Sequence, residues 1–481
     1  MDEDLKIKKQ FFKGSVWLFG SNVFARLFGF ITTLVLAKVL MPEDFGVVGY
    51  GFLVVNSVAL FKMMGFNTAL IYQKEKTQEA ASSLFWFLVL WSIFLYCLIF
   101  MVSPVIAGFF REQRLVHLVQ VLGLSIIINS ISSIPISLLE KDIHFKKRIL
   151  PDVSKLIIYS VTTIFLAFKG FSYWSFIWGT LLADLAQLVF SFFLKPVKIA
   201  LRVDFSLLRE MFRFGKSIVG LSFLQFGVRN IDDFFIGRML ETASLGIYQF
   251  SYRIANVPAT NITNVFGQIL FPTFAKIAHD DAKLMNAFIK FFRYIVILTV
   301  PLTFYIVLII PDFVQLYYEQ WQKAILPIQL ISYFGLLRAI GSGMGSVFYA
   351  KGKPHKLLPI SAFQFIILAL LLYPFIRWYG ITGACIAINI SMTYSIMATF
   401  LELHKMIKVP FPKIFTYLVI PIFLSVALFL GVHFFNDVLG FTGELEFYVK
   451  LVLFPVLIAA GYFLVIPDRK DIFRELMSMS K

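Results

Sequence analysis

Residues 15–37 read SVWLFGSNVFARLFGFITTLVLA, a mostly apolar run that is interrupted by a single arginine, Arg26. A membrane-crossing helix needs about 20 such residues. The run is longer than the apolar region of a cleavable signal peptide, which is about 7–15 residues, and it continues directly into the rest of the chain. We therefore expect a retained first membrane span with an arginine deep inside it.

The composition of the whole chain supports this reading. Of the 481 residues, 59% are hydrophobic and 15% are charged, and the mean hydropathy is +0.81. Soluble chains are about half apolar and a quarter charged. The composition excludes a disordered protein, a disulfide scaffold and a cytosolic enzyme. Cys97 and Cys385 both lie inside apolar runs, so no structural disulfide is expected.

Apolar runs of spanning length recur fourteen times along the chain. They lie at about 15–37, 46–72, 84–110, 115–138, 153–169, 174–194, 214–237, 245–275, 288–310, 324–350, 357–376, 380–401, 414–434 and 448–466. The sequence therefore predicts an all-α integral membrane protein with about 14 transmembrane helices.

The basic residues give the orientation of these spans. With the N-terminus in the cytoplasm, 31 of the 44 Lys and Arg residues fall in inside segments and 8 in outside segments. This excess is the pattern of the positive-inside rule, so both termini are predicted to be cytoplasmic. In the longest loop, Leu207, Leu208, Met211 and Phe212 can face opposite to Arg209, Glu210 and Arg213, which predicts an interfacial helix on the inner leaflet.

An internal repeat relates the two halves of the chain. At an offset of 200 residues, Ala37-Lys38-Val39-Leu40 aligns with Gly237-Arg238-Met239-Leu240, and Phe45-Gly46-Val47 aligns with Leu245-Gly246-Ile247. Leu150-Pro151 aligns with Leu358-Pro359 at an offset of 208. The predicted domains are an N-lobe at 1–195, a cytoplasmic interfacial linker at 196–213, a C-lobe at 214–401, and two further helices with a cytoplasmic tail at 402–481.

Two pseudo-symmetric six-helix lobes are an architecture of transporters. An even number of spans makes the repeats parallel, and two such lobes enclose a cavity that rocking opens to one side at a time. The alternative is an old duplication without a transport role.

Ionisable residues inside the spans are the candidate site residues, because a charge in mid-bilayer is costly unless it has a function. The basic candidates for binding an anionic substrate are Arg26, Lys62, Arg229, Arg253 and Arg338. Polar residues that share helical faces with them are Asn22, Thr33, Gln225, Gln249 and Asn256. Arginine offers a planar fork that matches phosphate oxygens, so these residues favour an anionic, hydroxyl-rich substrate.

The acidic residues of the spans are Asp184, Asp232 and Asp233, which are the candidates for coupling to an ion. An alternative is that Arg229 simply pairs with Asp232 or Asp233 on its own helix. Lys62 has a long stem that could snorkel toward water. The histidines have no metal spacing, and P-loop and nucleophile-elbow motifs are missing. We therefore expect no catalytic residue, metal or cofactor.

The segments Gly14-Ser15-Val16-Trp17-Leu18, Arg26 and 30–46 (FITTLVLAKVLMPEDFG) resemble the polysaccharide-transporter branch of the multidrug/oligosaccharidyl-lipid/polysaccharide flippase superfamily. This branch includes the Wzx O-antigen flippases and the colanic and teichuronic acid exporters. Lys38 and Met41 depart from the Arg and Gly expected there. The resemblance implies a fold like those of the MATE transporters and MurJ.

The resemblance also implies a function. Such proteins carry undecaprenyl-diphosphate-linked oligosaccharide across the bacterial inner membrane for O-antigen, capsule or exopolysaccharide synthesis, beside polymerase and chain-length machinery. Related lipid II flippases hold the diphosphate with arginines between their lobes, a role that falls here on Arg26 and Arg253, and more loosely on Arg229 and Arg338. In those relatives the two terminal spans form a groove for the lipid tail.

Three other functions remain open. A multidrug or cation antiporter of the same fold conflicts with a cavity of net positive charge, and a lipid II flippase is a close relative. A membrane polysaccharide polymerase or ligase is a different class, and such enzymes usually need a large outer loop. The outer loops of this chain are short.

Overall fold

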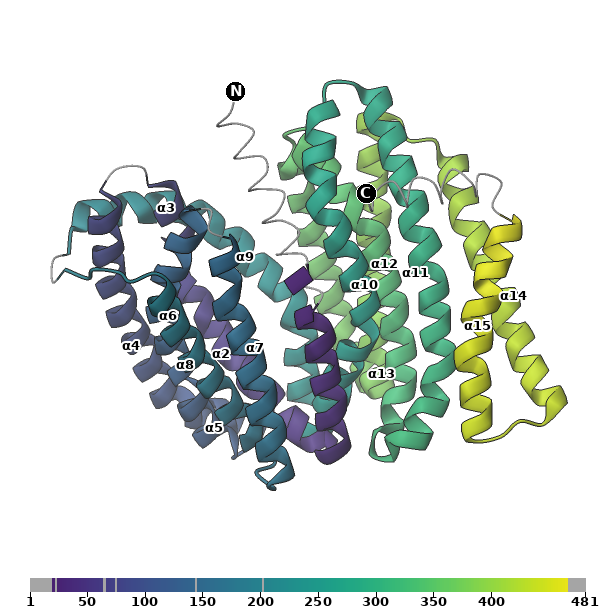
Figure 1. Ribbon diagram of the computed structural model, residues 1–481, viewed down its shortest axis with the longest axis horizontal. Coiled ribbons are helices and arrows are strands. Elements are labelled where there is room, and N and C mark those ends of the chain that lie inside the picture. Colours follow the sequence, from purple (N-terminus) through teal and green to yellow (C-terminus); the bar gives the residue numbers. More distant parts are fainter. Residues whose placement is uncertain are drawn as a thin grey trace. The chain divides into compact units, whose positions relative to one another are not determined.

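The computed structural model describes residues 20–21, 24–63, 66–73, 76–142, 145–200 and 203–465 (Figure 1). These residues are mostly α-helical and contain no strand. A first helix occupies residues 24–39. The other elements are α2 (Pro42–Met63), α3 (Phe66–Tyr72), α4 (Thr77–Phe110), α5 (Leu115–Leu122), α6 (Leu124–Lys141), α7 (Phe145–Phe168), α8 (Trp174–Leu194), α9 (Phe205–Met239), α10 (Thr242–Ile277), α11 (Asp281–Tyr317), η1 (Glu319–Ala324), α12 (Ile325–Ala350), η2 (Pro354–Lys356), α13 (Leu357–Ile407), α14 (Phe411–Leu439) and α15 (Glu444–Val465).

These helices confirm the prediction of an all-α membrane protein. Within the described ranges, each predicted span coincides with a helix or with a pair of consecutive helices, and α13 contains two of them. The two parts of α13 meet at Gly380, whose φ of 57° and ψ of −134° are non-helical and suit a residue without a Cβ. Ten helical segments of the described chain are long and apolar enough to cross a membrane.

The helices often begin before the apolar runs because polar residues cap their first turns. The Asp204 side chain accepts hydrogen bonds from the backbone N–H groups of Ser206 and Leu207 at the start of α9. Asp280 caps α11 in the same way. A side chain that accepts these otherwise unpaired N–H groups stabilises the helix start.

The chain divides into two compact units, which we describe separately. Unit 1 comprises Met1–Phe250 and Phe365–Ala384, and unit 2 comprises Ser251–Gln364 and Cys385–Lys481. In unit 1 a buried apolar cluster joins α3, α4, α6 and the first turns of α9. Leu207, Leu208 and Met211 belong to this cluster, so the apolar face of the 205–213 segment packs on protein, while Phe212 stays largely exposed.

Unit 2 is built around α11, which packs against α12, α14 and α15. Large apolar side chains from α11, α12 and the end of α13 form its main core. The Lys450 ammonium of α15 is buried and lies 2.8 Å from an Asp312 carboxylate oxygen on α11 and 2.6 Å from a Glu446 oxygen. The two terminal helices are therefore a packed part of unit 2.

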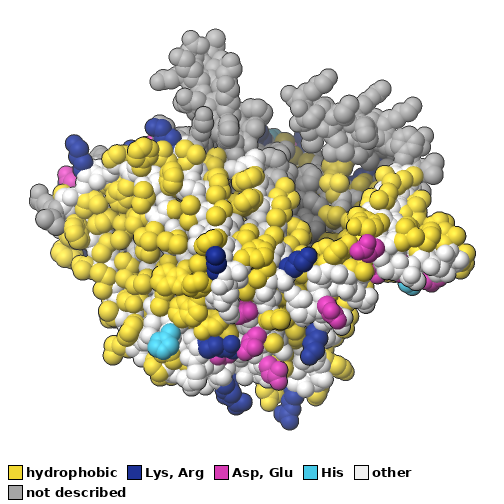
Figure 2. Space-filling view, turned by 60° about the horizontal axis from the view of Figure 1, so that its bottom comes forward, with side chains coloured by type: hydrophobic (Ala, Val, Ile, Leu, Met, Phe, Trp, Pro, Cys, Tyr) yellow, Lys and Arg dark blue, Asp and Glu magenta, His cyan; other side chains and the backbone are white. Residues whose placement is uncertain are grey.

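The outer surface of the helices matches a bilayer environment. Figure 2 shows a face covered mainly by hydrophobic side chains, with charged side chains gathered toward one edge. Met101 and Phe193 are examples of large apolar side chains that are mostly exposed. Soluble monomers rarely expose so broad an apolar surface, and the chain is a multi-pass membrane protein.

Candidate functional site

An ion pair with a buried carboxylate joins α7 and α8 in unit 1. Asp184 lies midway along α8, and only 1% of its surface is exposed. The Lys155 ammonium of α7 is 2.6 Å from Oδ1 of Asp184, and the Asn129 amide of α6 donates a hydrogen bond to Oδ2 at 2.8 Å. A buried carboxylate needs such partners, because an isolated ion loses its hydration at high cost.

Further polar side chains connect this ion pair to one end of α7. The Lys155 ammonium also donates to Oε1 of Gln187 at 3.2 Å, and Nε2 of Gln187 donates to an Asp152 oxygen at 2.8 Å. Arg148 bonds both Asp152, at 2.5 Å, and Glu140, at 2.7 Å. Because Asp152 and Glu140 are exposed, a continuous polar chain leads from the surface to the buried carboxylate.

Lys62, in the last turn of α2, adds a second cation. Its side chain is buried, with 6% exposure, and it lies close enough to Asp184 and Lys155 to interact with both electrostatically. Within the described ranges Lys62 forms no ion pair of its own. We call Lys62, Asn129, Lys155, Asp184 and Gln187 the charge cluster. Its two lysines and one aspartate give it a net positive charge inside the membrane-spanning part.

Sequence reasoning identified Lys62 and Asp184 as separate candidates and missed the other three members of the charge cluster. Lys155 lies inside α7, within the span predicted at 153–169, but it was not among the candidate residues. The sequence signal that could have identified the missed residues is their helical spacing from other charged residues. Asp152 and Lys155, like Asp184 and Gln187, are three residues apart and therefore share a helix face.

The first helix carries the candidates Arg26 and Thr33. Arg26 is half-buried, and Asn22 falls outside the described residues. The Thr33 hydroxyl donates to the Gly29 carbonyl oxygen of its own helix at 3.0 Å. Its neighbour Thr32 donates to the Ser160 hydroxyl at 2.9 Å, which ties this helix to α7.

On α9 the candidate residues point in different directions. Arg229 and Gln225 are exposed, whereas Asp232 is buried and accepts a hydrogen bond from the Tyr248 hydroxyl. Asp233 is half-buried. Within the described ranges, Asp232 is hydrogen-bonded to Tyr248 and forms no ion pair with Arg229.

The last candidates lie on α10 and α12. Gln249, on the unit 1 part of α10, is half-buried. In unit 2, Arg253 is exposed and Asn256 is buried, both on α10. Arg338 of α12 is half-buried, and its guanidinium group lies 3.4 Å from the hydroxyl of Tyr252. Tyr252 directly precedes Arg253 in the sequence.

A close contact joins the N-terminal turns of α2 and α10, at the end that the charge pattern assigns to the outside. A Cβ atom on Gly46 would lie 1.9 Å from the Thr242 carbonyl oxygen, and one on Gly246 would lie 1.8 Å from the Pro42 carbonyl oxygen. Both pairs of residues are related by the repeat offset of 200. The two repeats therefore pack on each other through equivalent glycines.

An ion-pair network surrounds this contact. Glu112 accepts hydrogen bonds from Arg114, at 2.7 Å and 2.8 Å, and from the Thr242 hydroxyl, at 2.9 Å. Arg114 also pairs with Glu43 at 2.5 Å. The hydrogen bonds from Arg114 lower the pKa of Glu112 below its usual range. The network thus links α2, α10 and the loop after α4.

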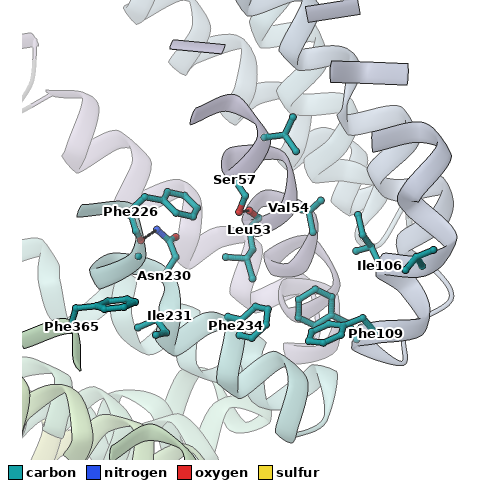
Figure 3. A pocket seen from close by; sticks show the side chains of 14 residues that line it. Leu53, Val54, Ser57, Ile106, Phe109, Phe226, Asn230, Ile231, Phe234 and Phe365 are labelled. Carbon is teal, nitrogen blue, oxygen red and sulfur yellow. Dashed lines mark hydrogen bonds between the residues drawn. The ribbon is translucent and has the colours of Figure 1, made fainter. Parts of the chain in front are cut away.

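Unit 1 also holds an apolar cavity of about 580 Å³ between α2, α4 and α9, closed on one side by Phe365 (Figure 3). Its few polar side chains form hydrogen bonds with backbone carbonyl oxygens of their own helices. The Ser57 hydroxyl donates to the Leu53 carbonyl oxygen at 2.6 Å, and the Asn230 amide donates to the Phe226 carbonyl oxygen at 2.8 Å. The cavity therefore suits hydrocarbon better than water.

A sequence profile described as "Polysaccharide biosynthesis protein" matches residues 35–326, which is more than half of the chain. The chain belongs to this family. Among its relatives, the teichuronic acid biosynthesis protein TuaB of Bacillus subtilis (strain 168) is 28% identical over 298 residues, or 60% of this chain. The chain matches 61% of the length of TuaB.

Two further similarities extend over most of this family member. The lipopolysaccharide biosynthesis protein WzxC of Escherichia coli (strain K12) is 23% identical over 412 residues, covering 84% of this chain and 82% of WzxC. The solved structure of the lipid II flippase MurJ in an inward closed conformation matches with a TM-score of 0.73 and 15% identity, covering 96% of this chain and 99% of MurJ. The chain thus has the fold seen in the MurJ structure.

Proposed function

We propose that this chain moves undecaprenyl-diphosphate-linked oligosaccharide from the cytoplasmic to the outer leaflet of a bacterial inner membrane. The observation that carries the proposal is the net positive charge of the charge cluster in unit 1, where the buried Lys62 and the partly exposed Lys155 outnumber the single carboxylate of Asp184. Buried charge of one sign favours a ligand of the opposite sign. The names of the relatives, which refer to teichuronic acid and lipopolysaccharide, support a sugar-polymer precursor as that ligand.

In this mechanism Arg26 and Arg253 hold the diphosphate, with Arg229, Arg338 and Lys62 as further cations. Guanidinium groups bind phosphate oxygens in pairs, which gives both strength and orientation. The polyprenyl tail stays in lipid while alternating access turns the headgroup to the other side. No bond is made or broken, so the chain acts as a transporter and needs no catalytic residue.

Asp184, Asp232 and Asp233 are the groups that couple the cycle to an ion. Asp184 is favoured because a polar chain from the surface reaches it through Gln187 and Lys155. We further propose that both termini are cytoplasmic and that the flipped product passes to a polymerase with its chain-length machinery.

The proposal is tested by export of polymer from cells that carry variants at normal membrane abundance. Arg26→Ala and Arg253→Ala should abolish export, and lysine at either position should restore it only in part, because lysine lacks the planar fork. Arg377→Ala is the matched control, since Arg377 is an exposed arginine bonded only loosely to Tyr373 at 3.4 Å. Normal export by both alanine variants would refute the proposed site.

A further inference from the structure

The charge cluster holds two ammonium groups and a single carboxylate, so one of its cations has no counter-charge. The Lys155 ammonium lies 2.6 Å from Oδ1 of Asp184, whereas Lys62 forms no ion pair or hydrogen bond with any residue of the described ranges. A buried cation without a counter-charge loses its hydration and gains nothing in return. The contacts of Lys62 therefore give no structural reason for a lysine at this position.

The three charged groups differ in how much of each is exposed. The Lys155 side chain is 36% exposed, whereas Lys62 is 6% exposed and Asp184 only 1%. An anion that approaches the charge cluster can therefore touch the Lys155 ammonium, but it reaches neither of the two buried groups. Direct binding of a ligand falls to Lys155, and Lys62 acts through its electrostatic interaction with Asp184.

The exposed part of Lys155 does not face the acyl chains of the bilayer. α7 carries one stripe of large apolar side chains that are 39–67% exposed and recur at helical spacing, namely Leu150, Ile157, Val161, Phe165 and Phe168. Lys155 lies on another face of this helix, which it shares with Arg148 and Asp152 at spacings of seven and three residues. This polar face is the side from which a hydrated headgroup can approach.

Two further carboxylates on this polar side are already bonded. Asp152 accepts hydrogen bonds from Arg148 at 2.5 Å and from the Gln187 amide at 2.8 Å. Glu140, in the last turn of α6, shares Arg148 at 2.7 Å and is 42% exposed, so solvent screens its charge. Among the described residues, Asp184 is therefore the carboxylate that competes with a ligand for the lysine ammonium of α7.

Asp184 can keep a counter-charge while Lys155 binds a ligand, because Lys62 is nearby. The charges of Lys62 and Asp184 already interact, and the flexible four-carbon stem of a lysine lets its ammonium move. The Asn129 amide still donates to Oδ2 of Asp184. Removing one partner of a buried ion pair leaves an uncompensated charge, which is strongly unfavourable. A second lysine removes this obstacle, so the Lys155 ammonium can turn to an anion.

We propose that Lys155 binds a phosphate of the headgroup and that Lys62 is a positioning residue, which replaces Lys155 as the counter-ion of Asp184 while the headgroup is bound. The inference rests on the proposed function and deepens it, because it adds Lys155 to the anion site and gives Lys62 an indirect part in binding. An ammonium group suits this exchange, since it binds phosphate as a point charge and can rotate between partners.

Binding of a short lipid diphosphate to the purified full chain tests the exchange. The probe is farnesyl diphosphate, titrated into phosphatidylcholine nanodiscs that hold the protein, with empty nanodiscs as the blank. Lys155→Met and Lys62→Met should each weaken binding about tenfold, because Lys155 is then either absent or held by Asp184. Lys413→Met, at an exposed lysine, should bind the probe as the wild type does. Normal binding by Lys155→Met would overturn the proposal.

A second substitution separates an indirect role of Lys62 from direct contact and from a structural role. Asp184→Asn removes the carboxylate that holds Lys155, so Lys62→Met combined with Asp184→Asn should bind the probe as tightly as the wild type. Lys155→Met combined with Asp184→Asn should remain about tenfold weaker. Both double variants remove one charge of each sign, so the net charge of the chain is unchanged. If the first double variant bound as weakly as Lys62→Met alone, the exchange would be refuted.

Two competitors identify the chemistry that Lys155 recognises. Excess inorganic diphosphate should displace the probe from the wild type, because the contact is made to phosphate. Phosphatidylglycerol at the concentration of the probe should not displace it. Equal competition by phosphatidylglycerol would show a general site for anionic lipids and would overturn the proposal.

Failure of this exchange is distinguishable from failure of the proposed function. A missing rescue by Asp184→Asn would overturn the role of Lys62, even if Arg26→Ala and Arg253→Ala abolish export. Normal export in those two alanine variants would instead refute the proposed transport site, even if the rescue were complete.

Discussion

Gly46→Ala should destabilise the protein strongly, because the contact between α2 and α10 leaves no room for a methyl group. The added Cβ would lie 1.9 Å from the Thr242 carbonyl oxygen, whereas real Cβ atoms essentially never come within 3.0 Å of a neighbour. The two helix starts must separate by more than an ångström. Overpacking of this kind costs about 1–3 kcal/mol. Separation also strains the hydrogen bond from the Tyr50 hydroxyl to the Gly237 carbonyl oxygen (2.9 Å), worth about 1 kcal/mol.

The expected loss is therefore about 2–4 kcal/mol, measured as the free energy of unfolding in mixed detergent–SDS micelles. Gly246→Ala should give a similar loss, since its Cβ would meet the Pro42 carbonyl oxygen at 1.8 Å. The control is Gly108→Ala at the end of α4, where nothing lies within 4 Å of the added methyl group. That variant should be neutral or gain up to about 1 kcal/mol from the better helix propensity of alanine. If Gly46→Ala behaved like the control, the contact between the repeats would be refuted.

Three further predictions concern charged groups. Asp184→Asn and Lys155→Met should each lower the free energy of unfolding by up to about 3 kcal/mol, and the double variant should lose less than the sum of the two single losses. A loss in the double variant equal to that sum would show that the two charged groups are not coupled. Lys450→Met should destabilise unit 2 by a similar amount, because it leaves the carboxylates of Asp312 and Glu446 unpaired. The control is Lys413→Met, at an exposed lysine, and equal stability of the two variants would contradict the prediction. Arg114 lowers the pKa of Glu112 in the folded protein. The stability that this pair contributes should therefore be complete above the unfolded pKa of about 4.3, and it should fall as the pH drops through the lower folded pKa. Thermal melts of Arg114→Met should show a weaker acid dependence than those of the wild type.

The helices were predictable because bilayer thickness fixes the length of an apolar run. All of α8, for example, follows from the run at 174–194. The extra turns at the start of α9 depend on a polar cap at Asp204, which an apolar window does not register. Hydropathy thus predicts which segments form helices, whereas the positions of the helix ends depend on local hydrogen bonds.

The candidate site was less predictable because it depends on which helices pack together. Lys155 and Asp184 are 29 residues apart in sequence and meet only because α7 packs on α8. The apolar cavity has no sequence signature at all, since its volume results from the packing of α2, α4 and α9. Residue type identified candidates on single helices, and tertiary packing decided which of them form a cluster.

The internal repeat is symmetric in packing but not in charge, and this difference bears on mechanism. Gly46 and Gly246 occupy equivalent positions and contact each other's helices. At the offset of 208 residues that relates Leu150-Pro151 to Leu358-Pro359, however, Lys155 and Asp184 correspond to the apolar Phe363 and Met392. A ligand can shift an equilibrium between two conformations only if it interacts differently with them. Because Lys155 and Asp184 have no charged counterpart in the other repeat, an anionic headgroup interacts unequally with the two repeats. Replacing the equivalent pair by Phe363→Lys and Met392→Asp would restore charge symmetry, and we expect it to slow export; unchanged export would show that the asymmetry has no part in the cycle.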